Sequence, residues 1–141
     1  MNDSVMLDSS FWIALADESD QWHSDAIATL DVIEDRLWLI PWPTLYEFIN
    51  TRLMRQKEKA FGIRRKLSGP RVHYVDDAPY RTRCLEEYMD ARIFQQPLSL
   101  VDSVMRAMLS DPQFRISCLV TFNLRDFEDV CAQTGVILLP D

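Results

Sequence analysis

The sequence predicts an α/β fold, a three-layer α/β/α sandwich with a mostly parallel central sheet. Short runs that are apolar throughout recur along the chain, as expected for strands covered on both faces of a parallel sheet. Segments in which apolar residues follow helical spacing alternate with these runs. The length of 141 residues suits a single domain, residues 1–141, and no repeat or linker interrupts it.

The individual elements follow from the same patterns. Strands are predicted at residues 5–7, 37–40, 71–75, 118–121 and 136–139. Helices are predicted at residues 11–16, 22–33, 43 to about 56, a basic stretch to about 67, 79–94 and 99–109. In the helix that begins at Pro43, Leu45, Ile49 and Leu53 form the inner stripe, and periodicity alone places Glu47 on the solvent side.

The composition is that of an ordinary globular protein, with 48% hydrophobic and 26% charged residues. No apolar stretch reaches the roughly 18 residues that cross a bilayer, and the first residues do not resemble a signal peptide. We therefore expect a cytoplasmic protein without a membrane partner. The cysteines, the histidines and the tryptophans are all interpreted as packed or surface residues, the tryptophans as core or dimer contacts in preference to base-stacking platforms: Cys84, Cys118, Cys131, His23, His73, Trp12, Trp22, Trp38 and Trp42.

A basic segment stands out from an acidic chain whose formal net charge is −7. Between residues 52 and 71 there is a single acid, Glu58, and eight cations: Arg52, Arg55, Lys57, Lys59, Arg64, Arg65, Lys66 and Arg71. A cationic segment on an acidic body can bind a phosphate backbone. It can equally be the solvated face of a helix. The sequence leaves both interpretations open.

Four acids follow predicted strands or stand in the first turns of predicted helices: Asp8, Glu47, Asp102 and Asp126, with Asn123 as a substitute for the last. In a parallel sheet with right-handed crossovers such positions lie at one edge, so these side chains can converge. Each also has a purely structural interpretation. Asp8 or Ser9 can cap the following helix, Asp102 belongs to a Ser-x-x-Asp sequence close to a capping box, and Asn123 and Asp126 suit turns.

Converging carboxylates require a cation. Two of them about 4 Å apart repel by about 4 kcal/mol at an effective dielectric constant of 20. Oxygen ligands without histidine or cysteine favour Mg²⁺, with Mn²⁺ as a substitute, over zinc. Such an ion activates water and polarises a phosphoryl oxygen, so an acidic site beside a basic segment predicts phosphodiester hydrolysis.

The acids lie in segments that resemble the PIN-domain ribonucleases, in particular the VapC-type toxins of bacterial toxin–antitoxin pairs. The segments are Val5 to Ile13, Leu45 to Asn50, Pro97 to Asp102, and Leu119 to Phe127. Their order and approximate spacing match the acid, Glu, acid, Thr-x-Asp/Asn pattern of that family over nearly the whole chain. Asn123 departs from it, because many members carry Asp there, and a neutral amide binds a metal less strongly than a carboxylate.

The resemblance implies a Mg²⁺-dependent endoribonuclease with a PIN-like fold. It assigns Asp8 and Asp102 as the main metal ligands, Glu47 as a ligand or water-orienting base, and Asp126 as the fourth acid. The polar supports are Ser9, Thr121 and Asn123. The resemblance also implies an RNA substrate, a homodimer with a shared groove lined by the basic segment, and a cognate antitoxin protein that blocks the groove.

Two other functions remain open at this point. A PIN-like module that binds RNA or a protein without cutting would keep the fold, and the Asn123 departure is the feature that favours it. A phosphoacceptor receiver domain also gathers acids at strand ends. It usually has paired acids after the first strand and a lysine after the last, whereas this chain has Asp8-Ser9-Ser10 and no lysine after Lys66.

Overall fold

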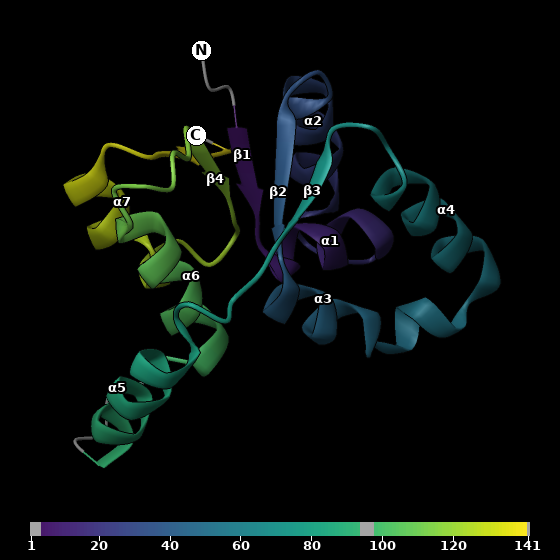
Figure 1. Ribbon diagram of the computed structural model, residues 1–141. Coiled ribbons are helices and arrows are strands. Elements are labelled where there is room, and N and C mark those ends of the chain that lie inside the picture. Colours follow the sequence, from purple (N-terminus) through teal and green to yellow (C-terminus); the bar gives the residue numbers. More distant parts are fainter. Residues whose placement is uncertain (1–3, 94–97, 141) are drawn as a thin grey trace.

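A five-stranded parallel sheet forms the centre of the computed structural model, which describes residues 4–93 and 98–140 (Figure 1). The strands are β1 (Ser4–Leu7), β2 (Leu37–Pro41), β3 (Val72–Val75), β4 (Cys118–Val120) and β5 (Ile137–Leu139). Their order is β3-β2-β1-β4-β5, and every neighbouring pair is parallel. The predicted fold class is therefore confirmed. β1 lies in the middle, between β2 and β4, so the residue that follows it is central to one edge of the sheet.

Helices cover both faces of the sheet, which gives the three predicted layers (Figure 1). One face is covered by α1 (Ser9–Ala16), α2 (His23–Ile33), α3 (Trp42–Ile49) and α4 (Lys57–Leu67). On the other face lie α6 (Leu100–Ser110) and α7 (Glu128–Thr134), with α5 (Arg81–Ile93) packed against α6. Two short 3₁₀ helices, η1 (Arg52–Arg55) and η2 (Leu124–Asp126), complete the described elements. No helix in these described ranges is both long enough and apolar enough to cross a membrane.

Alternate residues of the central strand enter two separate cores. Val5 and Leu7 pack with the first group of helices, whereas Met6 packs with the second, and all three are fully buried. Because both faces are covered, β1 is apolar from Val5 to Leu7, as the sequence indicated. Trp12 anchors the first core, with its ring 5.4 Å from that of Phe48.

The helix that begins after β2 is shorter than predicted. It ends at Ile49 instead of about Gln56, and the chain continues as η1. Two side chains near this end bind helix carbonyl groups, since Asn50 donates to the Tyr46 carbonyl and Thr51 to the Phe48 carbonyl. Such local bonds compete with the continuing helix. Ile49, which was predicted to lie on the inner side of this helix with Leu45 and Leu53, is the last residue of the helix and is 46% exposed, so that prediction was wrong.

A helix between β4 and β5 was missing from the sequence interpretation. α7 begins after Phe127, has Glu128 and Asp129 in its first turn, and ends at Gly135, whose φ of 79° is left-handed. Acids in the first turn and a terminal glycine are standard signals for helix ends. Phe94 and Pro97, which the sequence placed at the end of one helix and before the next, lie outside the described residues.

Two of the four tryptophans are core residues, as predicted. Trp12 and Trp38 are buried, whereas Trp22 and Trp42 are about 40% exposed. Each exposed indole stacks on another aromatic ring, Trp22 on Phe122 and Trp42 on Tyr74. The interpretation as core residues therefore does not hold for Trp22 and Trp42.

Candidate acidic site at the carboxyl edge of the sheet

Asp8 follows β1 directly and is only 1% exposed. Its carboxylate accepts hydrogen bonds of 2.8 Å from the Ser9 backbone N–H, the Ser10 hydroxyl and the Thr121 hydroxyl. Desolvation raises the pKa of Asp8, and the hydrogen bonds oppose that rise. The capping interpretation is correct, since Asp8 is the N-cap of α1. Capping accounts for the bond from the Ser9 N–H alone, and the hydroxyl groups of Ser10 and Thr121 also hold the carboxylate at the edge of the sheet.

The same two hydroxyl groups connect Asp8 to the loop after β4. The Ser10 oxygen accepts from the Phe122 N–H at 3.0 Å, and the Thr121 oxygen accepts from the Asn123 N–H at 3.0 Å. Thr121 was predicted as a support, whereas Ser10 was not singled out. The sequence did contain a signal for Ser10. A hydroxyl side chain two residues after an acid at a helix start can turn back and bind the carboxylate of that acid.

Glu47 approaches this group from α3. The helical wheel placed it on the solvent side, and the residue is indeed exposed, but its Oε1 accepts from the Ser9 hydroxyl at 2.8 Å. Desolvation raises the pKa of Glu47, and the negative charge of Asp8 raises it further, against the hydrogen bond from Ser9. Ser9 thus joins Asp8 and Glu47, since its N–H binds one acid and its hydroxyl binds the other.

Asp102 lies in the first turn of α6. The capping acceptor there is Ser99, whose hydroxyl oxygen accepts from the Asp102 N–H at 3.0 Å. Desolvation and the charges of Asp8 and Asp126 raise the pKa of Asp102 to about 7. The side chain of Asp126 also interacts with that of Asp102, and this interaction raises the Asp102 pKa further. Three carboxyl groups from separate segments therefore influence one another here.

Arg106 fixes the position of Asp126. It lies one turn after Asp102 on α6 and donates from Nη1 to the Asp126 carbonyl at 2.8 Å. Its two terminal nitrogens also bind both oxygens of Asp129, at 2.6 and 2.7 Å. Sequence reasoning missed Arg106, and the only signal was its four-residue spacing from Asp102. Asn123 contributes backbone contacts, as its carbonyl accepts from the Asp126 N–H at 3.1 Å.

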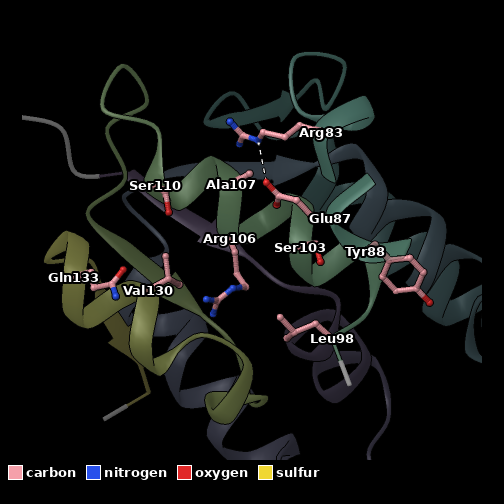
Figure 2. A pocket seen from close by; sticks show the side chains of 10 residues that line it. All are labelled: Arg83, Glu87, Tyr88, Leu98, Ser103, Arg106, Ala107, Ser110, Val130 and Gln133. Atoms are coloured by element: carbon pink, nitrogen blue, oxygen red, sulfur yellow. Dashed lines mark ion pairs between the residues drawn. The ribbon is translucent and has the colours of Figure 1, made fainter. Parts of the chain in front are cut away.

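A cavity of about 340 Å³ lies between α5, α6 and α7, but it is separate from the acids. Figure 2 shows Arg83, Glu87 and Arg106 among the side chains that line it, and none of the four predicted acids is in its lining. Its two cations already have partners, because Arg83 pairs with Glu87 and Arg106 with Asp129. We therefore place the candidate site at the acidic edge and not in this cavity.

The acidic edge has the donor chemistry of a divalent-cation site without its arrangement. Among the residues that the structure describes, no three histidine, cysteine or acidic side chains are placed to surround a metal ion. The donors nevertheless fit a hard cation: they are oxygen atoms, they are desolvated, and their charges repel.

The predicted basic segment forms η1 and α4. The exposed members are Arg52, Arg55, Lys57, Arg64 and Arg65, whereas Lys59 and Lys66 are partly buried. Lys59 has a structural contact, since its ammonium group donates to the Ala16 carbonyl at the end of α1 at 2.7 Å. The segment begins three residues after α3, the helix that carries Glu47.

Comparison with known proteins gives two similar solved structures. The VapC20 toxin of Mycobacterium tuberculosis, described as cleaving the sarcin-ricin loop, has a TM-score of 0.68 and 20% identity over 89% of this chain and 94% of that chain. A chain of the Rickettsia felis VapBC2 structure, bound to a DNA fragment from its promoter, has a TM-score of 0.59 and 15% identity over 96% of each chain. No family model and no curated protein matches the sequence. The structural similarities establish the fold, and this chain has the PIN-domain fold of the VapC toxins.

Proposed function

We propose that this protein is a Mg²⁺-dependent endoribonuclease that acts as the toxin of a toxin–antitoxin pair. One observation carries the proposal. Asp8, Glu47 and Asp102 come from three separate segments, and each of them has a raised pKa to which desolvation contributes most. Perturbed carboxyl groups gathered at one edge of a sheet are typical of functional sites. A protein of the same fold is described as a toxin that cleaves the sarcin-ricin loop.

In this proposal Asp8 and Asp102 bind the cation, and Asp126 joins them as the fourth acid. Mn²⁺ could replace Mg²⁺, and either ion would stabilise negative charge on the phosphate and lower the pKa of water. Glu47 accepts the proton of the attacking water, and Ser9 orients its carboxylate. Thr121 and Asn123 support the loop after β4.

The proposed partners follow from charge and from the fold. Arg52, Arg55, Lys57, Arg64 and Arg65 would contact RNA phosphates, with Lys59 and Lys66 beside them. VapBC2, the second similar structure, motivates the further proposal of an antitoxin partner, and the resemblance to the VapC-type toxins motivates that of a homodimer. We place this single-domain protein in the cytoplasm.

The experiment compares RNA cleavage by the wild-type protein with that by Asp8→Asn and Asp102→Asn. Wild type should cut RNA with Mg²⁺ and stop when EDTA removes the ion. Each variant should lose at least about 100-fold in rate, since each removes charge from the cation site. Asp31→Asn, which neutralises an exposed acid on α2, is the control and should cut normally. Metal-dependent cutting by both folded site variants would contradict the proposal.

The alternative is a module that binds RNA without cutting it. The neutral amide of Asn123 favours this alternative, because an amide binds a metal less strongly than a carboxylate does. It predicts RNA binding that weakens with salt, does not respond to Mg²⁺, and is unchanged in Asp8→Asn and Asp102→Asn. The same preparations distinguish the two functions when binding and cleavage are measured together.

A further inference from the structure

A second cavity, of about 480 Å³, borders the acidic edge. Asp126 belongs to its lining, together with Asn123 and Arg125 from the same loop. Two aromatic rings, those of Trp22 and Phe122, also line it. The cavity therefore combines a flat apolar surface, hydrogen-bonding side chains and one of the acids proposed to bind the cation.

The aromatic surface consists of two stacked rings. The Trp22 and Phe122 rings have centroids 5.3 Å apart and an interplanar angle of only 7°. Trp22 remains 39% exposed, so the stack leaves part of the indole open to a ligand. The two rings come from positions a hundred residues apart, the start of α2 and the loop after β4, so the fold itself produces the stack.

Hydrogen bonds fix the backbone of both aromatic residues, and the rings pack on each other. The Trp22 N–H donates to the Asp20 carboxylate at 2.8 Å, and the Trp22 carbonyl accepts from the Ala26 N–H at 2.8 Å. The Phe122 N–H donates to Ser10, whose hydroxyl also binds Asp8. The aromatic stack and the buried acid therefore share one support. A ligand on such a surface loses little to side-chain ordering.

A nucleobase matches this cavity better than an aliphatic group does. Parallel aromatic rings bind planar π systems by stacking, and such stacking tolerates any base. The guanidinium of Arg125 and the amide of Asn123 supply donors for the polar edge of a base or for the adjoining phosphate. The neighbouring Asp126 places the cavity within one or two nucleotides of a phosphate bound at the acidic edge.

We propose that Trp22 and Phe122 form a stacking subsite for one nucleobase next to the RNA phosphate bound at the acidic edge. This inference rests on the proposed function. It revises the interpretation of Trp22 as a core or dimer contact. Since a base that stacks here fixes the position of the strand, the subsite sets which phosphodiester bond reaches the acids.

The test measures binding separately from cutting. The background is Asp102→Asn, which should bind RNA without cleaving it, and the probes are a labelled uridine hexanucleotide and an abasic hexanucleotide with the same phosphates. Trp22→Ala should weaken binding of the uridine probe by about 5- to 150-fold, the range for loss of one base stack. It should leave the abasic probe unchanged, and Trp22→Phe should restore most of the loss.

Trp42→Ala is the matched control, because Trp42 is 40% exposed and stacks on Tyr74 near β3, away from β4. It should bind both probes as the background protein does. If Trp22→Ala proves unstable, Trp22→Leu keeps the apolar volume without the aromatic face and gives the same comparison. Equal losses for both probes, no loss for either, or no binding of the uridine probe by the background protein would overturn the subsite.

The outcomes also separate this inference from the proposed function. If wild type and Trp22→Ala cut RNA at the same rate and at the same bonds, the stacking subsite is refuted and the proposed nuclease function stands. If wild type binds the uridine probe through Trp22 but never cuts RNA, the stacking subsite stands and the proposed nuclease function is refuted. Anisotropy of the labelled probes and gel analysis of the cut sites provide the two measurements.

Discussion

Thr121 links the acid at the end of β1 to the loop after β4, although it carries no charge. Its hydroxyl donates to the Asp8 carboxylate and accepts from the Asn123 N–H, and the residue is fully buried. Removal of this hydroxyl leaves a buried carboxylate with one donor fewer and a backbone N–H without its acceptor. Each of these losses costs about 1–3 kcal/mol.

We therefore expect Thr121→Val, which keeps the shape of the side chain, to lower the free energy of unfolding by at least about 2 kcal/mol. The matched control is Thr29→Val. Thr29 is also buried, but its hydroxyl donates only to the Asp25 carbonyl within α2, so its loss should cost much less. Urea denaturation measures both variants. Equal losses in the two would show that the hydroxyl of Thr121 contributes nothing beyond its burial.

Among the single residues of the site, the sequence indicated the acids but not the side chains that bind them. Asp8 and Asp102 could be predicted because strand ends and helix starts are recognisable in a sequence and converge at one edge of a parallel sheet. The contact of Ser10 with Phe122 could not be predicted, since the two residues are 112 positions apart in the chain. The exposed position of Glu47 was correct by periodicity, yet its contact with Ser9 depends on how α3 packs against α1.

Arg106 joins three elements at the acidic edge. It lies on α6 and binds the backbone of η2 through Asp126 and the side chain of Asp129 on α7. The bond to η2 holds Asp126 beside Asp102, one turn earlier on α6. Arg106 is thus a positioning residue in the proposed cation site.

Arg106→Ala should reduce both stability and cation binding. Three charge-assisted bonds disappear, but Asp129 is largely solvated, so we expect a loss of only about 1–2 kcal/mol in the free energy of unfolding. The Mn²⁺ titration midpoint should rise several-fold, because η2 is no longer held, and Arg106→Lys should recover part of this loss. Arg83→Ala is the control, since its exposed 3.8 Å contact with Glu87 contributes little (Figure 2). Normal Mn²⁺ binding by a destabilised Arg106→Ala would limit Arg106 to a structural role.

The elements themselves were predictable where the pattern was simple. All five described strands were found. Short apolar runs between polar turns predicted four of them, and β3 was predicted from the alternation of Val72 and Tyr74 with polar residues. The end of α3 was not found, since the side chains of Asn50 and Thr51 compete for helix carbonyl groups only in the folded geometry. α7 was missed because it is short and follows a loop rich in turn residues, despite the glycine at its end.

The whole molecule brings together carboxyl groups that repel one another when no cation is present. Between pH 3.8 and about 7, folded Asp102 keeps a proton that the unfolded chain has lost. The folded state therefore binds more protons, and the free energy of unfolding falls as the pH rises through this window. Asp8 and Glu47 act in the same direction, because their pKa values are also raised. The lowered pKa values of Asp77 and Asp129 affect stability only at lower pH.

We expect the metal-free protein to lose about 1–2 kcal/mol of unfolding free energy between pH 5 and pH 7.5, after allowance for the partial solvation of Asp102. Asp102→Asn removes the titrating group, so it should show a flatter profile and exceed wild type in stability at pH 7.5. Mn²⁺ should stabilise wild type more at pH 7.5 than at pH 5, because cations bind the deprotonated carboxylates. Urea denaturation in EDTA and in Mn²⁺ tests all three expectations. An equally steep pH profile in Asp102→Asn would show that groups outside this cluster cause the pH dependence of the unfolding free energy.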